Sequence, residues 1–302
     1  MIKLLSCFTC LLSILLIVKM TLLRNLILIL FLLVTGFNVS AHGDLHERIL
    51  EVTQEIKISP DSAFLYFKRG KLYHQHNDFE NSLKDLKKSR KLGLRNNEQS
   101  FLFAKNYFYL KKYNIGIKYA SKILKDQPNN VSAQKIIGKT YFQQKKYKKA
   151  ALSFEKVILN SKETFPDNYL DASKAWYALR KENGIERAQS LLIEAIEELG
   201  NNIVLYNKLI AYNVDLGDYS SAINFQKKVI DFSHRKERGY LKLAKLQILQ
   251  KNYTEAIKSI ELAKKYYSDL PKRIRHTKFM MAFYSELELE EEILKSKHSK
   301  RG

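Results

Sequence analysis

The feature that most constrains the fold of this chain is a recurrence of side chains at intervals of 34 residues. Gly70, Ala104 and Gly138 keep this interval. Three further columns share it: Tyr73, Tyr107 and Tyr141, then Phe79, Tyr113 and Tyr147, and then Ser82, Gly116 and Ala150. In the second half, Ala188, Ala222 and Ala256 repeat with the same period. A period of this length indicates an array in which one helical hairpin stacks on the next.

Packing explains why the columns alternate between small and large residues. Two antiparallel helices approach to roughly 8–10 Å only where the side chains at their crossing are small. Gly70 and Ser82 are suited to that position, and Tyr73 and Phe79 to the volume beside it. The interval between Ala150 and Ala188 is 38 residues, which predicts a four-residue insertion within residues 161–168.

The columns carry a resemblance to a known family. The spacing Tyr66-x2-Arg69-Gly70-x2-Tyr73, followed by Phe79, Ser82 and Leu86, is similar to the tetratricopeptide repeat, and it returns as Gln134-x2-Ile137-Gly138-x2-Tyr141 with Tyr147, Ala150 and Phe154. The resemblance implies an all-α, right-handed solenoid of about six helix-turn-helix repeats. We expect the repeats to start near Ala63, Asn97, Val131, Tyr169, Ile203 and Glu237. Only 11 glycines and 4 prolines interrupt the chain, which also favours helices.

These expectations divide the chain into six segments. A leader or signal peptide is expected at 1–41, a capping helix at 42–62, three repeats with the insertion at 63–168, and three more at 169–270. A long C-terminal capping helix would follow at 271–296, with Ile274, Met281, Tyr284 and Leu287 facing inward, and a disordered tail at 297–302. Repeat arrays need such caps because an end repeat would otherwise expose its apolar face.

The first 41 residues suggest export. From Met20 the chain presents Arg24, an apolar run and then Val39 and Ala41, short residues at the positions that a signal peptidase reads. We therefore expect cleavage after Ala41 and a periplasmic or secreted protein. An uncleaved membrane anchor is the alternative, and the sequence leaves open whether Met1 or Met20 is the start. The only cysteines, Cys7 and Cys10, lie in this leader.

Charge narrows the class of partner. The net charge of +21 would fall to +18 on cleavage, because Lys3, Lys19 and Arg24 would be lost and no acidic residue with them. Such an excess attracts polyanions. Export disfavours nucleic acid, so we expect an acidic protein or peptide, with membrane contact only through an uncleaved leader. No catalytic motif is present in the predicted mature chain, which favours a non-catalytic scaffold.

The resemblance also implies where a partner would bind. In this family the first helix of each repeat lines the concave surface, and its second, fifth, sixth, ninth and twelfth residues most often meet a ligand. The candidate groove residues at or beside these positions are Phe67, Lys71, Phe101, Lys105, Phe108, Lys139, Lys174, Lys208 and Lys242. Lysines with interspersed aromatic residues predict an extended partner that is both acidic and apolar.

Histidines near the predicted cleavage site support a second hypothesis. Cleavage after Ala41 would place an α-amine and an imidazole on His42, with His46 four residues further on. Such nitrogen donors suit Cu(II). The alternative function is therefore an exported copper-binding protein, with the repeats as a docking module. Under the scaffold hypothesis no cofactor is expected.

Overall fold

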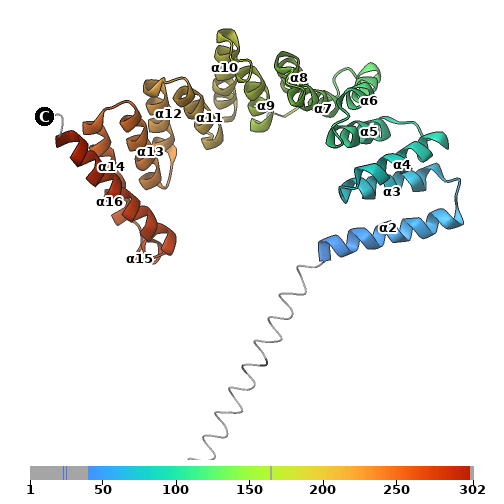
Figure 1. Cartoon of the computed structure of the whole chain (residues 1–302), viewed down its shortest axis with the longest axis horizontal. Coiled ribbons are helices and arrows are strands. Elements are labelled where there is room, and N and C mark those ends of the chain that lie inside the picture. Colours follow the sequence, from blue (N-terminus) through green and yellow to red (C-terminus); the bar gives the residue numbers. More distant parts are fainter. Residues whose placement is uncertain (1–22, 24, 26–39, 164, 300–302) are drawn as a thin grey trace, which may run out of the picture. The chain divides into compact units, whose positions relative to one another are not determined.

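The computed structural model describes residues 23, 25, 40–163 and 165–299, and in these ranges its regular structure is helical (Figure 1). The helices are α2 (Ser40–Ile58), α3 (Ala63–Gln75), α4 (Phe79–Lys91), α5 (Asn97–Tyr109), α6 (Tyr113–Asp126), α7 (Val131–Gln143), α8 (Tyr147–Asn160), α9 (Pro166–Tyr177), α10 (Glu182–Leu199), α11 (Ile203–Asp215), α12 (Tyr219–Phe232), α13 (Lys236–Leu249), α14 (Tyr253–Ser268), α15 (Lys272–Arg275) and α16 (Lys278–Ser299). Most helices adjacent in the chain pack on one another, as in an α solenoid of helix-turn-helix repeats.

The chain divides into two compact units, residues 1–122 and 123–302, with the boundary inside α6. The expected division into two sets of three repeats, at residues 63–168 and 169–270, stays a prediction. Each unit is described by itself below.

In the first unit the small residues lie at helix crossings, as packing requires. The Ser82 hydroxyl donates a hydrogen bond of 2.6 Å to the Gly70 carbonyl, so α4 lies directly against α3. A Cβ atom at Gly70 would lie 3.3 Å from the Leu86 side chain. Leu86 and Phe103 are fully buried beside this crossing and form the centre of the unit.

An ion pair and an apolar cluster join α2 to the first repeat. Arg69 on α3 donates two hydrogen bonds, of 2.6 and 2.8 Å, to the carboxylate of Asp85 on α4, and a third of 3.1 Å to Thr53 on α2. Both charged side chains are largely buried. Four apolar residues complete the contact: Ile49, Val52, Ile56 and Leu72.

One turn recurs between the two helices of most repeats. A single residue with positive φ ends the first helix, and it is Asn77, Lys111, Lys145, Gly217 or Lys251 in successive turns of this kind. The backbone N–H of the next residue donates a hydrogen bond to the carbonyl five residues earlier in the chain. For example, the N–H of Lys146 donates to the Tyr141 carbonyl at 2.9 Å. In three of these turns that next residue, Asp78, Asp218 or Asn252, also caps the second helix with its side chain.

In the second unit a glycine and a phenylalanine define the closest approach of α7 and α8. A Cβ atom at Gly138 would lie 2.8 Å from the ring of Phe154, which is buried. The ring therefore occupies the space that a side chain would fill. The contact shows why the glycine column recurs.

The fourth repeat differs in register from the sequence pattern. Its first helix, α9, begins at Pro166, three residues before the expected start, because proline fits the first position of a helix. Ala172 and Ala175 are fully buried, and Ser173 bonds to the Ala188 carbonyl of α10 at 2.7 Å. The indole N–H of Trp176 instead donates a hydrogen bond of 2.9 Å to the carboxylate of Glu155 on α8. The small Ser173 of α9 therefore contacts α10, whereas the large Trp176 contacts α8.

The C-terminal cap is interrupted. A short helix, α15, precedes α16, and the break at His276 and Thr277 separates them, where one continuous helix was expected. The buried face of α16 holds Met280, Phe283, Leu287 and Leu294, whereas Met281 is 51% exposed and does not face inward. The helix continues to Ser299, and residues 300–302 of the expected tail lie outside the described residues.

Candidate functional site

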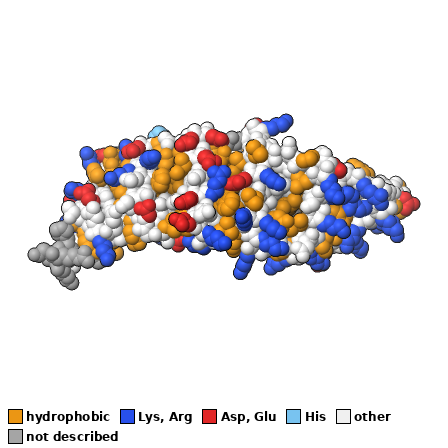
Figure 2. Space-filling model, turned by 90° about the horizontal axis from the view of Figure 1, so that it is seen from above, with side chains coloured by type: hydrophobic (Ala, Val, Ile, Leu, Met, Phe, Trp, Pro, Cys, Tyr) orange, Lys and Arg blue, Asp and Glu red, His pale blue; other side chains and the backbone are white. Residues whose placement is uncertain are grey.

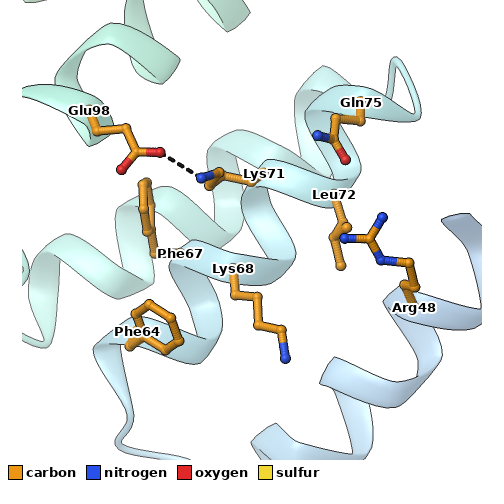
Figure 3. A pocket seen from close by; sticks show the side chains of 8 residues that line it. All are labelled: Arg48, Phe64, Phe67, Lys68, Lys71, Leu72, Gln75 and Glu98. Atoms are coloured by element: carbon orange, nitrogen blue, oxygen red, sulfur yellow. Dashed lines mark hydrogen bonds and ion pairs between the residues drawn. The ribbon is translucent and has the colours of Figure 1, made fainter.

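In the first unit, the expected groove residues Phe67 and Lys71 line a pocket of about 240 Å³ between α2, α3 and α5. Figure 3 shows the exposed ring of Phe64 beside that of Phe67, and Arg48 reaching in from α2. Lys71 forms an ion pair of 2.6 Å with Glu98 on α5. Phe67 is 5% exposed and packs into the core of the unit. The charge of Lys71 is thus already balanced, and Phe67 offers little surface to a ligand.

The remaining candidates of the first unit lie on α5 and are half-buried. Lys105 lies over the ring of Phe101 at 5.6 Å, and Phe108 packs on Tyr109 with the ring centres 5.4 Å apart. The neighbouring Asn106 is fully buried and bonds to His74 and Ser82. The Asn106 side chain is therefore part of the core and is not accessible to a ligand.

The second unit brings two of the expected lysines together in one depression. We call it the lysine groove, and its volume is about 470 Å³. It is lined by Phe142, Tyr147, Lys174, Tyr177, Ala178, Arg180, Lys208, Ala211, Tyr212 and Asp215. These residues come from α7, α9 and α11, the first helices of successive repeats, from the first residue of α8, and from the turn after α9.

A buried pair of stacked aromatic rings supports one side of the lysine groove. Tyr177 and Tyr212 stack with ring centres 3.7 Å apart and planes 7° from parallel. The Tyr177 hydroxyl donates a hydrogen bond of 2.6 Å to the carboxylate of Asp215, which also forms an ion pair with Arg180. These hydrogen bonds lower the pKa of Asp215, that from Tyr177 most. Burial raises the pKa of Tyr212 to about 12, so this phenol is neutral at ordinary pH.

The two lysines of the groove are held over rings instead of carboxylates. Lys174 lies 5.1 Å from the ring centre of Phe142, and Lys208 lies 4.9 Å from that of Tyr212. In the part of the chain that the structure describes, neither lysine forms an ion pair. Burial, and then the nearby charge of Lys174, lower the pKa of Lys208. The groove is therefore a place where added negative charge would be stabilised.

The other two candidate lysines of the second unit, Lys139 and Lys242, lie outside the lysine groove. Lys139 is exposed on α7, and its charge acts on Asp171, whose pKa is nevertheless raised because burial outweighs the lysines around it. Lys242 lines a separate, larger depression of about 760 Å³ together with Arg238 and Val204. Figure 2 shows basic side chains interspersed with hydrophobic ones over the visible face of the molecule.

The histidines proposed for copper lie at the start of α2. His42 and His46 are one helical turn apart and so belong to one face of the helix. His46 is exposed, whereas the side chain of His42 lies outside the described residues. Among described side chains, no group of three or more histidine, cysteine or acidic residues is placed to hold a metal. Copper binding stays a prediction.

The leader also lies almost wholly outside the described residues, including Cys7 and Cys10. Among the helices that the structure describes, none has the length and apolar character of a membrane span. Cleavage and export therefore stay predictions.

Comparisons with known proteins agree with this architecture. A family model described as Tetratricopeptide repeat matches residues 136–163, which cover the C-terminal part of α7 and the whole of α8. The chain is a tetratricopeptide-like helical repeat protein. Its fold resembles that of a tetratricopeptide repeat protein from Parabacteroides merdae, at 14% identity and a TM-score of 0.52, over 86% of this chain and 96% of that one.

A second solved structure is similar to this tetratricopeptide-like protein to the same degree. The C-terminal part of a TPR repeat-containing protein from Cytophaga hutchinsonii gives 15% identity and a TM-score of 0.52, over 77% of this chain and 86% of that one. At such identities the likeness concerns the fold alone. A search of the curated proteins found no match.

Sequence reasoning identified the lysines of the groove but missed the tyrosines. A local signal was available: Tyr177 follows Lys174 by three residues, and Tyr212 follows Lys208 by four. Residues at these separations are neighbours on a helix surface. The same signal links Phe67 with Lys71 and Phe101 with Lys105 in the first unit.

Proposed function

We propose that this protein is a non-catalytic interaction scaffold that binds an acidic, partly apolar segment of a peptide or protein partner in the lysine groove. Tetratricopeptide-like folds generally serve as such scaffolds. The observation that carries the proposal is the pair Lys174 and Lys208, which lie over aromatic rings and lack a carboxylate partner in the described part of the chain.

The physical reason is electrostatic. Two ammonium groups near one another, one of them partly withdrawn from water, repel each other. A carboxylate placed between them removes that repulsion and supplies the missing counter-charge. The aromatic rings hold both lysines in position beforehand, so that little side-chain freedom is lost on binding.

The half-buried rings of Phe142 and Tyr147, which also line the groove, account for the apolar part of the ligand. Tyr177 and Tyr212 are buried and stack on one another, with Lys208 over Tyr212, so they support the groove from beneath. Aliphatic or aromatic side chains of a ligand are buried favourably against the more accessible rings. The ion pair of Arg180 with Asp215 closes one side of the groove and leaves no spare positive charge there. A ligand is thus expected to place its acidic groups on the lysines and its apolar groups on Phe142 and Tyr147.

A peptide titration tests the proposal. The probe is a fluorescein-labelled peptide of alternating glutamate and leucine, and the readout is fluorescence anisotropy. Lys174→Glu/Lys208→Glu should weaken binding by at least about tenfold, because close charge pairs are replaced by repulsion. Raising the salt from about 50 to 300 mM should weaken binding to the unaltered protein.

The matched control is Lys148→Glu/Lys227→Glu, which makes the same change of net charge at exposed positions on α8 and α12. We expect this variant to bind the probe nearly as well as the unaltered protein. Equal loss in both double variants would show that overall charge, and not the lysine groove, holds the peptide. That result would refute the proposed site.

The place of action is part of the proposal. The leader predicted at residues 1–41 suggests that the scaffold works outside the cytoplasm, with the chain starting at His42. Amino-terminal sequencing of the protein recovered from cell fractions tests this, and recovery with Met1 or Met20 at the terminus would contradict cleavage.

A further inference from the structure

The last helix of the chain leaves an unusual face exposed. On α16, Leu289 is 57% exposed and Ile293 is 40% exposed, and these two residues are one helical turn apart. Glu288 and Glu292 are exposed at the adjacent positions, also one turn apart. An acidic stripe therefore runs beside an apolar one. The outer face of a terminal cap is ordinarily polar throughout, so two large apolar side chains on it indicate a binding surface.

The charge of this helix is opposite to that of the chain as a whole. Five of the seven residues from Glu286 to Glu292 are glutamates, in a chain whose net charge is +21. Three of the five, Glu286, Glu290 and Glu291, lie within 4.0 Å of lysines. No such pair involves Glu288 or Glu292 in the described part of the chain, so both are available to a basic partner.

We propose that α16 of one copy of this chain binds in the lysine groove of a second copy. This inference rests on the function proposed above, since it names the partner segment of that site. Glu288 and Glu292 would pair with Lys174 and Lys208, and Leu289 and Ile293 would pack on the accessible apolar lining of the groove, formed by Phe142, Tyr147 and Ala211. The binding mode is that of an amphipathic helix laid in a groove, with complementary charge setting its orientation.

Two other arrangements of α16 are less favourable. Pairing of two α16 helices would bring two glutamate-rich surfaces together, and like charges in contact oppose association. Folding back of α16 into the groove of its own chain would require it to leave α14, where Leu287 and Leu294 are fully buried. Loss of that core contact would cost far more than a surface contact returns. The helix is thus presented ready-folded to another molecule.

The arrangement has a consequence for assembly. Groove and helix are different surfaces, so the contact is heterologous, and each bound copy still offers a free groove or a free helix. The association should therefore continue beyond two copies, grow with concentration and weaken as salt screens the charges.

Sedimentation velocity of the purified full chain tests this, from low to high micromolar concentration and at about 50 and 500 mM salt. We expect the mass to rise with concentration at low salt and to fall at high salt. Two variants, Glu288→Lys/Glu292→Lys on the helix and Lys174→Glu/Lys208→Glu in the groove, should each remain monomeric alone. Mixed in equal amounts they should associate, because one supplies an intact groove and the other an intact helix.

The matched control is Glu186→Lys/Glu197→Lys, the same change of charge at exposed positions on α10. It should associate like the unaltered chain, and loss of association here would overturn the assignment to α16. A monomer under all conditions, or a helix variant that still associates, would also overturn it.

The labelled glutamate-leucine peptide separates this inference from the proposed function. If the unaltered chain binds the peptide but stays monomeric, the groove is a binding site and its partner is another molecule. If the groove variant still associates, α16 does not use the lysine groove. Either result rejects the inference and leaves the proposed function standing. The proposed function is rejected by the absence of peptide binding, or by equal loss of binding in the groove variant and its charge-matched control.

Discussion

Replacement of Gly138 by alanine tests the packing rule on which the repeats depend. An added Cβ atom would lie 2.8 Å from Cε1 of Phe154, closer than carbon atoms approach without displacement. Phe154 is 3% exposed and surrounded by core residues, so its ring has little room to move. Overfilling a packed core costs about 1–3 kcal/mol.

The same substitution also has a favourable part. Alanine is preferred over glycine inside a helix by about 1 kcal/mol. The net change should therefore be a destabilisation of roughly 0–2 kcal/mol, which is the difference between those two effects. Because that range reaches zero, the single variant alone does not decide the question.

A double-mutant cycle with Phe154→Leu does decide it. Leucine leaves space where the ring was, so Gly138→Ala in this background should stabilise the protein by up to about 1 kcal/mol. Urea unfolding followed by far-UV circular dichroism would then give a coupling energy of about 1–3 kcal/mol between the two positions. A coupling energy near zero, or equal stabilisation by Gly138→Ala in both backgrounds, would refute the steric account.

Two further predictions concern ionisable groups. Asp85→Ala leaves the buried guanidinium of Arg69 without its carboxylate and should cost about 3–5 kcal/mol in urea unfolding. Glu55→Ala, which breaks the half-exposed pair with Lys68, should cost less than about 1 kcal/mol, and similar costs for both would show that burial of the first pair is unimportant. The pKa of Tyr212 is raised to about 12, so the folded chain keeps this proton after the unfolded chain has lost it. The free energy of unfolding should fall as the pH rises from about 10 toward 12, and less steeply in Tyr212→Phe, whereas identical slopes would contradict the assignment.

The sequence predicted the helical repeats well because their signal is local and periodic. The expected starts Ala63, Asn97, Val131 and Ile203 coincide with the first residues of α3, α5, α7 and α11. Each of these starts follows a serine or asparagine that caps the helix. Periodicity failed where the interval itself changes, at the insertion before α9. There Pro166 and the orientation of Trp176 decide the register.

The candidate site was less predictable, since it depends on which side chains meet between repeats. Lys71 and Lys174 looked alike in sequence as lysines on first helices. The structure pairs Lys71 with Glu98, 27 residues away, and gives Lys174 an aromatic neighbour instead. Such pairings depend on how one hairpin stacks on the next. The recurring columns of residues predict the order of the hairpins, but they do not predict where a long side chain such as lysine points.

The position of Trp176 has a practical consequence. It is the only tryptophan in the chain, and its indole joins α9 to α8 through Glu155, which also pairs with Arg187 of α10. Its fluorescence therefore reports on the junction of three helices in the middle of the second unit. In an array whose members touch only their neighbours, this gives a local optical probe of melting. Comparison of its emission with whole-chain ellipticity would reveal whether the interior hairpins open before, with or after the ends.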